Sequence, residues 1–403
     1  MKNPLRMEAS ARISSAWKGF LRLYFCFAIA SSFSGTFINT YLIRATGSSA
    51  GVMVFNIVLA GVQPFVMLAA VRLMRLKGAL FSQSIGMGLY AMAFLVLGVL
   101  GESAIPYIQW TAAVISAANA FFFTTYALQL LAYTDDGNRD ACYGVQNALG
   151  GLIGIVLPPL TGILLASFRD FTGYRIIFLL GLVVAAAAAF IALRLEPVSN
   201  MSPEVHLGRA LRVLLTKKPA RAAMLASAAN GFYGGTMSFF LNVLIYSIVR
   251  NEALIGGMGT ATSLIGIAAS MLYSRLVRPE NRMKSILISL GVMIAATCAL
   301  MLNVSLAGLI VFQLLLSAVS CFFLNPPTTA YFGVVEQMEE LRGLGSEVHA
   351  LREFWYGGGR VLGILVTILL SDLENGIGLI ILIILGVQVI PAFLLKRMKI
   401  EGR

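Results

Sequence analysis

Polar side chains that could bind a small molecule lie inside long apolar runs of this sequence. Hydroxyl and amide groups donate and accept hydrogen bonds, so they suit a neutral ligand. The same groups also bond one membrane helix to another, so the set carries more weight than any single member. The candidate cavity residues are Ser34, Thr36, Asn39, Asn119, Thr124, Tyr126, Asn230, Tyr233 and Asn325.

No acidic residue lies in the middle of a predicted apolar run. Ionisable groups at membrane depth serve as proton relays in many pumps, so this pattern argues against an obvious buried proton carrier. It also argues against a strongly cationic ligand, which would favour a buried carboxylate. We expect a neutral or amphipathic ligand. A coupling proton stays open as an additional partner, through acids at helix ends.

Charged residues gather where the apolar runs begin and end. Asp140 and Glu353 are predicted at the starts of two helices, where the helix dipole favours negative charge. Ion pairs from these acids to basic residues could close one end of the cavity, although plain capping is the alternative for the acids and interfacial anchoring for Arg360. The predicted gate consists of Arg72, Arg75, Asp140, Arg275, Arg278, Glu353 and Arg360.

One acidic segment resembles an enzyme motif. Asp135, Asp136 and Asp140 spell D-D-x-x-x-D, a spacing superficially like that of a magnesium–diphosphate site. No second aspartate-rich segment accompanies it, because Asp170 and Asp372 are predicted on the opposite side of the membrane. Both histidines fall in predicted loops, and the four cysteines show no paired spacing. We therefore expect no enzyme activity, no metal and no cofactor.

The elements that position these residues must lie in a membrane. The 403 residues are 58% hydrophobic and only 12% charged, whereas soluble proteins carry about a quarter charged residues. A spanning helix needs about 20 apolar residues. Twelve runs qualify, at 20–43, 51–71, 79–100, 107–131, 144–167, 174–193, 221–249, 254–273, 284–304, 306–335, 355–370 and 376–395.

The basic residues support this count and give an orientation. With both termini cytoplasmic, only Arg44, Arg169, Arg175 and Arg250 fall on the outer side, leaving 26 of the 30 Lys and Arg residues inside. Such a bias is the usual determinant of membrane topology. The net charge of +12 is spread over short loops, without a basic domain, so we expect no nucleic-acid partner.

The interruption between the sixth and seventh runs divides the chain in two. We expect a cytoplasmic segment at 1–19, a six-helix bundle at 20–193, a cytoplasmic loop at 194–220, a second bundle at 221–395 and a tail at 396–403. The halves repeat each other in order. Matching pairs are Gly35-Thr36 with Gly235-Thr236, Ser116-Ala117 with Ser317-Ala318, and Leu149-Gly150 with Leu362-Gly363.

Three segments should bend or tighten their helices. Pro158-Pro159 and Asn325-Pro326-Pro327 remove backbone hydrogen bonds and should kink the helices that contain them. Gly357-Gly358-Gly359 allows either close helix contact or a hinge.

Two related six-helix halves with a basic central loop resemble the major facilitator superfamily. The family's signature after the second helix, G-x-x-x-D-R-x-G-R-R/K, keeps only its basic positions Arg72 and Arg75. The antiporter signature G-x-x-x-G-P-x-x-G-G is partly matched in the fifth helix by Gly154, Pro159 and Gly162. The resemblance covers almost the whole chain in topology, but its local motifs are degenerate.

The resemblance implies an all-α fold of twelve transmembrane helices in two pseudo-symmetric six-helix bundles, which rock around a central site. It implies a monomeric secondary transporter of a small molecule in the bacterial plasma membrane. The partial fifth-helix motif favours export. The alternatives are a non-transporting membrane sensor or assembly protein and, with less support, a membrane-embedded enzyme.

Overall fold

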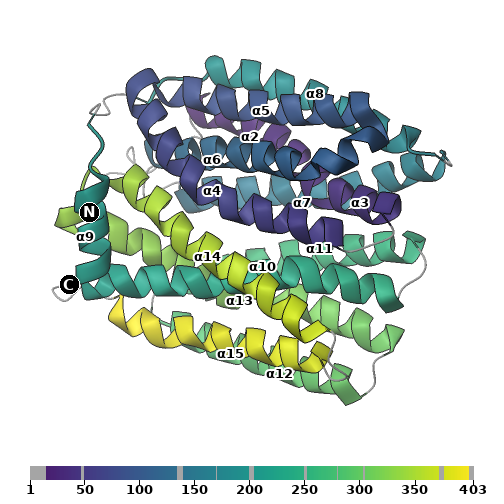
Figure 1. The fold of residues 1–403 in the computed structure, drawn as a ribbon. Coiled ribbons are helices and arrows are strands. Elements are labelled where there is room, and N and C mark those ends of the chain that lie inside the picture. Colours follow the sequence, from purple (N-terminus) through teal and green to yellow (C-terminus); the bar gives the residue numbers. More distant parts are fainter. Residues whose placement is uncertain are drawn as a thin grey trace. The chain divides into compact units, whose positions relative to one another are not determined.

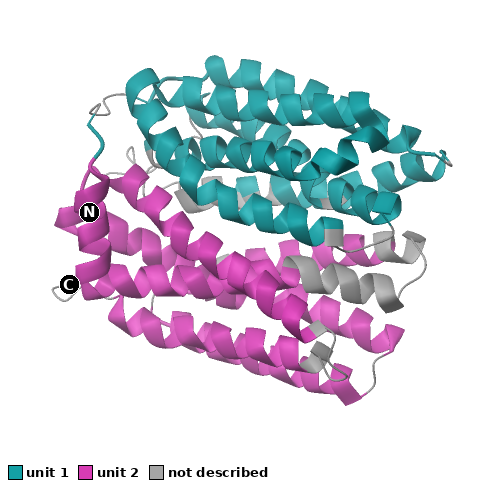
Figure 2. Cartoon of the chain, in the orientation of Figure 1, with its two compact units in different colours: residues 1–205 teal, residues 206–403 magenta. Residues whose placement is uncertain are grey.

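A computed structural model describes most of the chain, and the described residues form helices and short connections without strands (Figure 1). They are residues 15–46, 50–133, 139–168, 170–198, 204–248, 252–278, 280–302, 305–371 and 376–398. The chain divides into two compact units, Met1–Val205 and His206–Arg403, which Figure 2 colours separately.

Unit 1 begins with one long helical stretch that changes type midway. The α-helix α2 (Ser15–Ser32) runs into a π-helical segment, η1 (Phe33–Phe37), and continues as α3 (Ile38–Thr46). A π-helical turn inside an α-helix frequently marks a functional site. The remaining helices are α4 (Ala50–Lys77), α5 (Ala79–Leu100), the 3₁₀ turn η2 (Gly101–Tyr107), α6 (Ile108–Tyr133), α7 (Arg139–Ala166) and α8 (Thr172–Leu193).

The described residues of unit 2 form one short helix and six long ones. The short helix α9 (Leu207–Thr216) precedes α10 (Lys218–Ile248). There follow α11 (Glu252–Leu276), α12 (Arg282–Leu302), α13 (Leu306–Gln337), the 3₁₀ turn η3 (Glu339–Leu341), α14 (Gly345–Ser371) and α15 (Gly376–Arg397).

The long helices have the composition of membrane spans. Nine stretches of the described residues are long and apolar enough to cross a bilayer, so the exact number of twelve stays a prediction. In α8, Ile177, Gly181 and Ala185 are buried, while Leu180 and Val183 are at least half exposed. An exposed apolar face of this kind fits lipid as the surrounding solvent.

The two units pack their helices in the same way. The contacts α2–α7, α2–α8, α4–α6, α5–α6 and α5–α8 of unit 1 correspond to α10–α14, α10–α15, α11–α13, α12–α13 and α12–α15 of unit 2. The internal sequence repeat is therefore also a repeat of packing, and the chain has the expected all-α fold of two related helical bundles.

Two segments that we predicted as loops are helical. The predicted span at 355–370 starts ten residues earlier, because α14 begins at Gly345. The central loop contains α9. Both segments are rich in charged residues, and a search for apolar runs misses helices of that composition.

Candidate functional site

The first part of the candidate site is a hydroxyl and amide network inside unit 1. The Tyr90 hydroxyl of α5 donates to Asn119 Oδ1 of α6 at 2.7 Å. The Ser34 hydroxyl of η1 donates to the Ser31 carbonyl of α2 at 3.4 Å and is buried. Asn119 is thus held by Tyr90, a residue that the sequence did not single out.

The second part is a pair of amides beside the π-helical turn. Asn56 Nδ2 of α4 donates to Asn39 Oδ1 at 3.2 Å, and Asn39 Nδ2 donates to the Gly35 carbonyl at 2.7 Å. Both asparagines are only half-buried, so their remaining hydrogen-bonding capacity can be reached by a solute. The side chain of Thr36, another predicted member, lies outside the described residues.

Two other predicted residues serve the interior of unit 1. The Thr124 hydroxyl donates to the Ala120 carbonyl of its own helix at 2.7 Å and is almost fully buried. Gln146 Nε2 donates to the Tyr126 hydroxyl at 2.8 Å, and the Tyr126 ring packs against Phe20 at a centroid distance of 5.7 Å. The Thr124 bond stays within α6 and the Gln146 bond joins α7 to α6, so both groups already have partners inside unit 1.

In unit 2, the predicted residues surround the proline pair of α13. Pro326 has no N–H, so the Phe322 carbonyl loses its helical partner. Ser285 Oγ of α12 donates to that carbonyl at 2.9 Å. Asn230 Nδ2 of α10 donates to the Leu324 carbonyl at 3.1 Å, and its Oδ1 is buried without a partner among the described residues.

The other two predicted members of unit 2 lie close by in the chain. The ring of Tyr233 packs edge-on against Phe323 at 5.3 Å. Asn325, next to the proline pair, is half-buried. Asn230, Tyr233 and Asn325 therefore flank the irregular part of α13.

The predicted gate residue Glu353 is buried in unit 2 beside two arginines. Its carboxylate has Arg352 and Arg360 as charged neighbours. Arg352 Nε donates to Ser227 Oγ of α10 at 2.8 Å, and its guanidinium lies over the Tyr331 ring at 4.6 Å. Positive charges near a buried carboxylate lower the cost of burying it.

This position corrects two expectations. Glu353 does not start a helix, because α14 begins eight residues before it, at Gly345. The second is the expectation that acids lie only in loops or at helix ends, since Glu353 is buried beyond the first two turns of α14. Glu347 is also buried, but it lies in the first turn. His349, predicted in a loop, also lies in α14. The charged residues made this stretch look like a loop, whereas the fold supplies them with partners.

The pairing proposed for the rest of the gate stays a prediction. Arg72, Arg275 and Arg278 are exposed and Arg75 is half-buried. Asp140 lies at the start of α7 as predicted, but its side chain is outside the described residues. Arg360 lies over the Tyr356 ring, with 6.0 Å between Cζ and the ring centroid.

Sequence reasoning also missed a set of buried glutamines. Gln129 Nε2 donates to Gln83 Oε1 at 2.7 Å between α6 and α5, and both side chains are fully buried. Gln388 Nε2 of α15 donates to the Ala229 carbonyl of α10 at 2.8 Å. A single amide in an apolar run does not reveal which way it faces, so only spacing against a helical template could have pointed to them.

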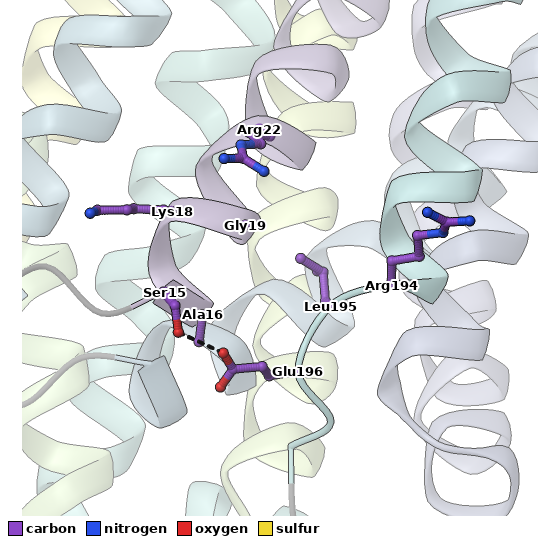
Figure 3. Close-up of a pocket in the computed structure, with 8 residues that line it drawn as sticks. All are labelled: Ser15, Ala16, Lys18, Gly19, Arg22, Arg194, Leu195 and Glu196. Carbon is purple, nitrogen blue, oxygen red and sulfur yellow. Dashed lines mark hydrogen bonds between the residues drawn. The ribbon is translucent and has the colours of Figure 1, made fainter.

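A cavity of about 290 Å³ lies between the first turns of α2 and the segment after α8 (Figure 3). It contains none of the predicted cavity residues. Figure 3 shows Lys18 and Arg194 pointing away from each other, and Ser15 donates to Glu196 at 2.8 Å. The cations do not converge, so we do not assign a ligand to it. Within the described parts of the chain, no group of three His, Cys, Asp or Glu residues could hold a metal ion.

Two curated relatives are similar in sequence and have no described activity. The uncharacterized protein YqgE of Bacillus subtilis is 23% identical over 363 residues, which cover 90% of this chain and 84% of that protein. An uncharacterized Geobacillus stearothermophilus protein is 24% identical over 153 residues, which cover 38% of this chain and 72% of that protein.

Solved structures of transporters share the fold. The Escherichia coli fucose:proton symporter FucP aligns with a TM-score of 0.71 and 12% identity, covering 95% of this chain and 98% of that one. An outward-facing bacterial homologue of the iron transporter ferroportin aligns with a TM-score of 0.71 and 13% identity, covering 96% and 99%. At these identities the likeness establishes the fold alone. Residues 20–364 match the family model described as Major Facilitator Superfamily, which confirms the resemblance found in the sequence, and this multi-pass membrane protein belongs to that superfamily of transporters.

Proposed function

We propose that this chain is a monomeric secondary transporter that moves a small neutral or amphipathic solute by alternating access of its two units. Its place is the bacterial plasma membrane, with both termini cytoplasmic, as the distribution of basic residues predicts. Export is the proposed direction, because the fifth-helix motif is partly kept. The half-buried amide pair Asn39 and Asn56 beside the π-helical turn carries the proposal of a neutral solute.

Asn39 supplies the test of solute binding. A melting-shift screen of the purified protein against sugars, amphipathic drugs, lipids and peptides would find a ligand, because a ligand that binds the folded state stabilises it. Asn39→Leu removes the hydrogen-bonding capacity at similar size, and we expect about tenfold weaker binding of that ligand. Thr124→Val is the matched control, because its hydroxyl is bonded within its own helix.

Flux into proteoliposomes then separates transport from sensing. A sensor or assembly protein would bind the ligand without moving it. If the solute is bound but no substrate-dependent flux is measured, the transporter assignment for this chain is wrong. If Thr124→Val weakens binding as much as Asn39→Leu, the amide pair is not the solute site.

For the coupling proton we propose Glu353. The Glu353 carboxylate is buried in α14 with Arg352 and Arg360 as charged neighbours, and intramembrane ionisable groups of this kind are functional candidates. The sequence leaves open a coupling proton through acids at helix ends, and Glu353 is one of the acids predicted there. The fucose relative is a proton symporter by name, and that coupling comes to this chain only as part of the proposal.

The test uses two kinds of flux. Glu353→Gln keeps the size and removes the titrating group, so proton-driven uptake or export should be lost while solute exchange at equal pH persists. Glu339→Gln is the control, because Glu339 is exposed on η3. Proton-driven flux that is unchanged in Glu353→Gln would exclude this residue as the proton carrier.

A further inference from the structure

The short helix α9 has an exposed face that none of the described residues covers. Ala210, Val213 and Leu214 are buried against unit 2, where α9 contacts α10, α14 and η3. On the other side, Leu211 and Leu215 are 41% and 46% exposed. They are four residues apart and so lie next to each other on one side of the helix.

The same segment carries positive charge without acids. Residues 207–221 contain five basic residues and no Asp or Glu, and all five are exposed: Arg209, Arg212, Lys217, Lys218 and Arg221. Lys217 is held by Glu340 of η3 at 2.6 Å. Within the described part of the chain, the other four have no acidic partner. The segment therefore combines two exposed leucines with unneutralised charge.

The position of α9 places this face at a membrane surface. Only Lys217 separates its end from the start of α10, which is a long helix of the membrane bundle. Figure 1 shows α9 lying across the ends of the long helices of unit 2. A helix that lies at the end of a bundle and carries leucines between basic residues has the pattern of an interfacial helix.

From this we infer that α9 binds anionic phospholipid headgroups of the leaflet on its side of the membrane, with Leu211 and Leu215 inserted among the acyl chains. The partner follows from charge complementarity, since a basic segment at the surface attracts anionic lipids. The Lys217–Glu340 contact and the buried face fix α9 to unit 2, so the site is held in place without the lipid. This inference does not depend on the transported solute.

The experiment uses the full chain in detergent, with its four cysteines replaced by alanine and an environment-sensitive fluorophore on Leu211→Cys. Short-chain phosphatidylglycerol and phosphatidylcholine are titrated separately. We expect phosphatidylglycerol to bind at least about fivefold more tightly than phosphatidylcholine. This is the effect expected when one basic residue lies near a charged membrane surface. Arg209→Gln with Arg212→Gln should abolish that preference. The control combines Lys396→Gln with Arg397→Gln, which removes an equal exposed charge at the end of α15. This control should keep the preference for the anionic lipid.

Equal responses to the two lipids would overturn the inference, as would loss of the preference in the α15 variant. A fluorescence change that grows with protein concentration and needs no lipid would instead assign the face to a second copy of the chain. If the cysteine-free protein does not fold, native mass spectrometry of the unlabelled protein and the two double variants gives the same comparison of retained lipids.

Discussion

The closest helix contact in unit 2 gives the sharpest prediction. Gly231 and Gly235 of α10 lie against backbone atoms of α14, and Gly359 and Gly363 of α14 lie against backbone atoms of α10. Each of these two glycine pairs has the spacing of four that lets membrane helices approach closely. A Cβ built on Gly359 would lie 2.1 Å from the Ala228 carbonyl oxygen, whereas ordinary contact begins at 3.4 Å. Gly359→Ala must therefore separate the two backbones by roughly 1.3 Å, the difference of those distances.

The expected effect follows from two opposing terms. Alanine is a better helix former than glycine by up to about 1 kcal/mol. Overpacking a tight contact costs about 1–3 kcal/mol, and the contact here is with backbone atoms, which cannot rotate away. Gly359→Ala should therefore lower the apparent melting temperature by a few degrees, since about 1 kcal/mol corresponds to roughly 2–4 °C for a domain of this size.

The adjacent residue is a matched control. A Cβ on Gly358 would meet nothing within 4 Å, so Gly358→Ala should leave the melting temperature unchanged or raise it. Both variants are measured in the same detergent at one heating rate, by circular dichroism. Equal shifts in the same direction, or a larger loss for Gly358→Ala, would refute the close contact of α10 and α14.

Two further predictions test the kink and the α9 anchor. Ser285→Ala should lower the free energy of unfolding by about 1–2 kcal/mol, because the Phe322 carbonyl loses its donor. Ser289→Ala is the control, since it removes only a bond within α12. Thermal unfolding compares the two variants, and equal losses of stability would contradict the role of Ser285. The hydrogen bond from Lys217 lowers the pKa of Glu340, so its stabilisation of α9 should be full above the usual carboxyl pKa and fade as the pH falls through the lowered one. Hydrogen exchange of α9 should therefore differ between wild type and Glu340→Gln at neutral pH and converge in acid, and a difference that persists in acid would contradict the pairing.

The membrane character, the repeat and the family could be predicted because each depends on patterns spread over many residues. The start of α14 could not, because Glu347, Arg352 and Glu353 look like loop residues until their partners in unit 2 are known. The helix α9 could not be predicted for the same reason, because only three of its ten residues are buried.

The glycine run at 357–359 was predicted either to tighten a contact or to act as a hinge. Gly359 makes the contact and Gly358 does not, so one residue of difference decides the role. Such a distinction depends on the rotation of α14 about its axis, which neighbouring glycines in a sequence do not reveal.

The backbone contact between α10 and α14 has a mechanical consequence. Two helices that touch through side chains can slide as rotamers change, but here no layer of side chains separates them. Ser227 and Arg352 add a polar link across the same crossing. A displacement of α10 at Asn230 must therefore carry α14 with it, and the surroundings of the Glu353 carboxylate change in the same movement.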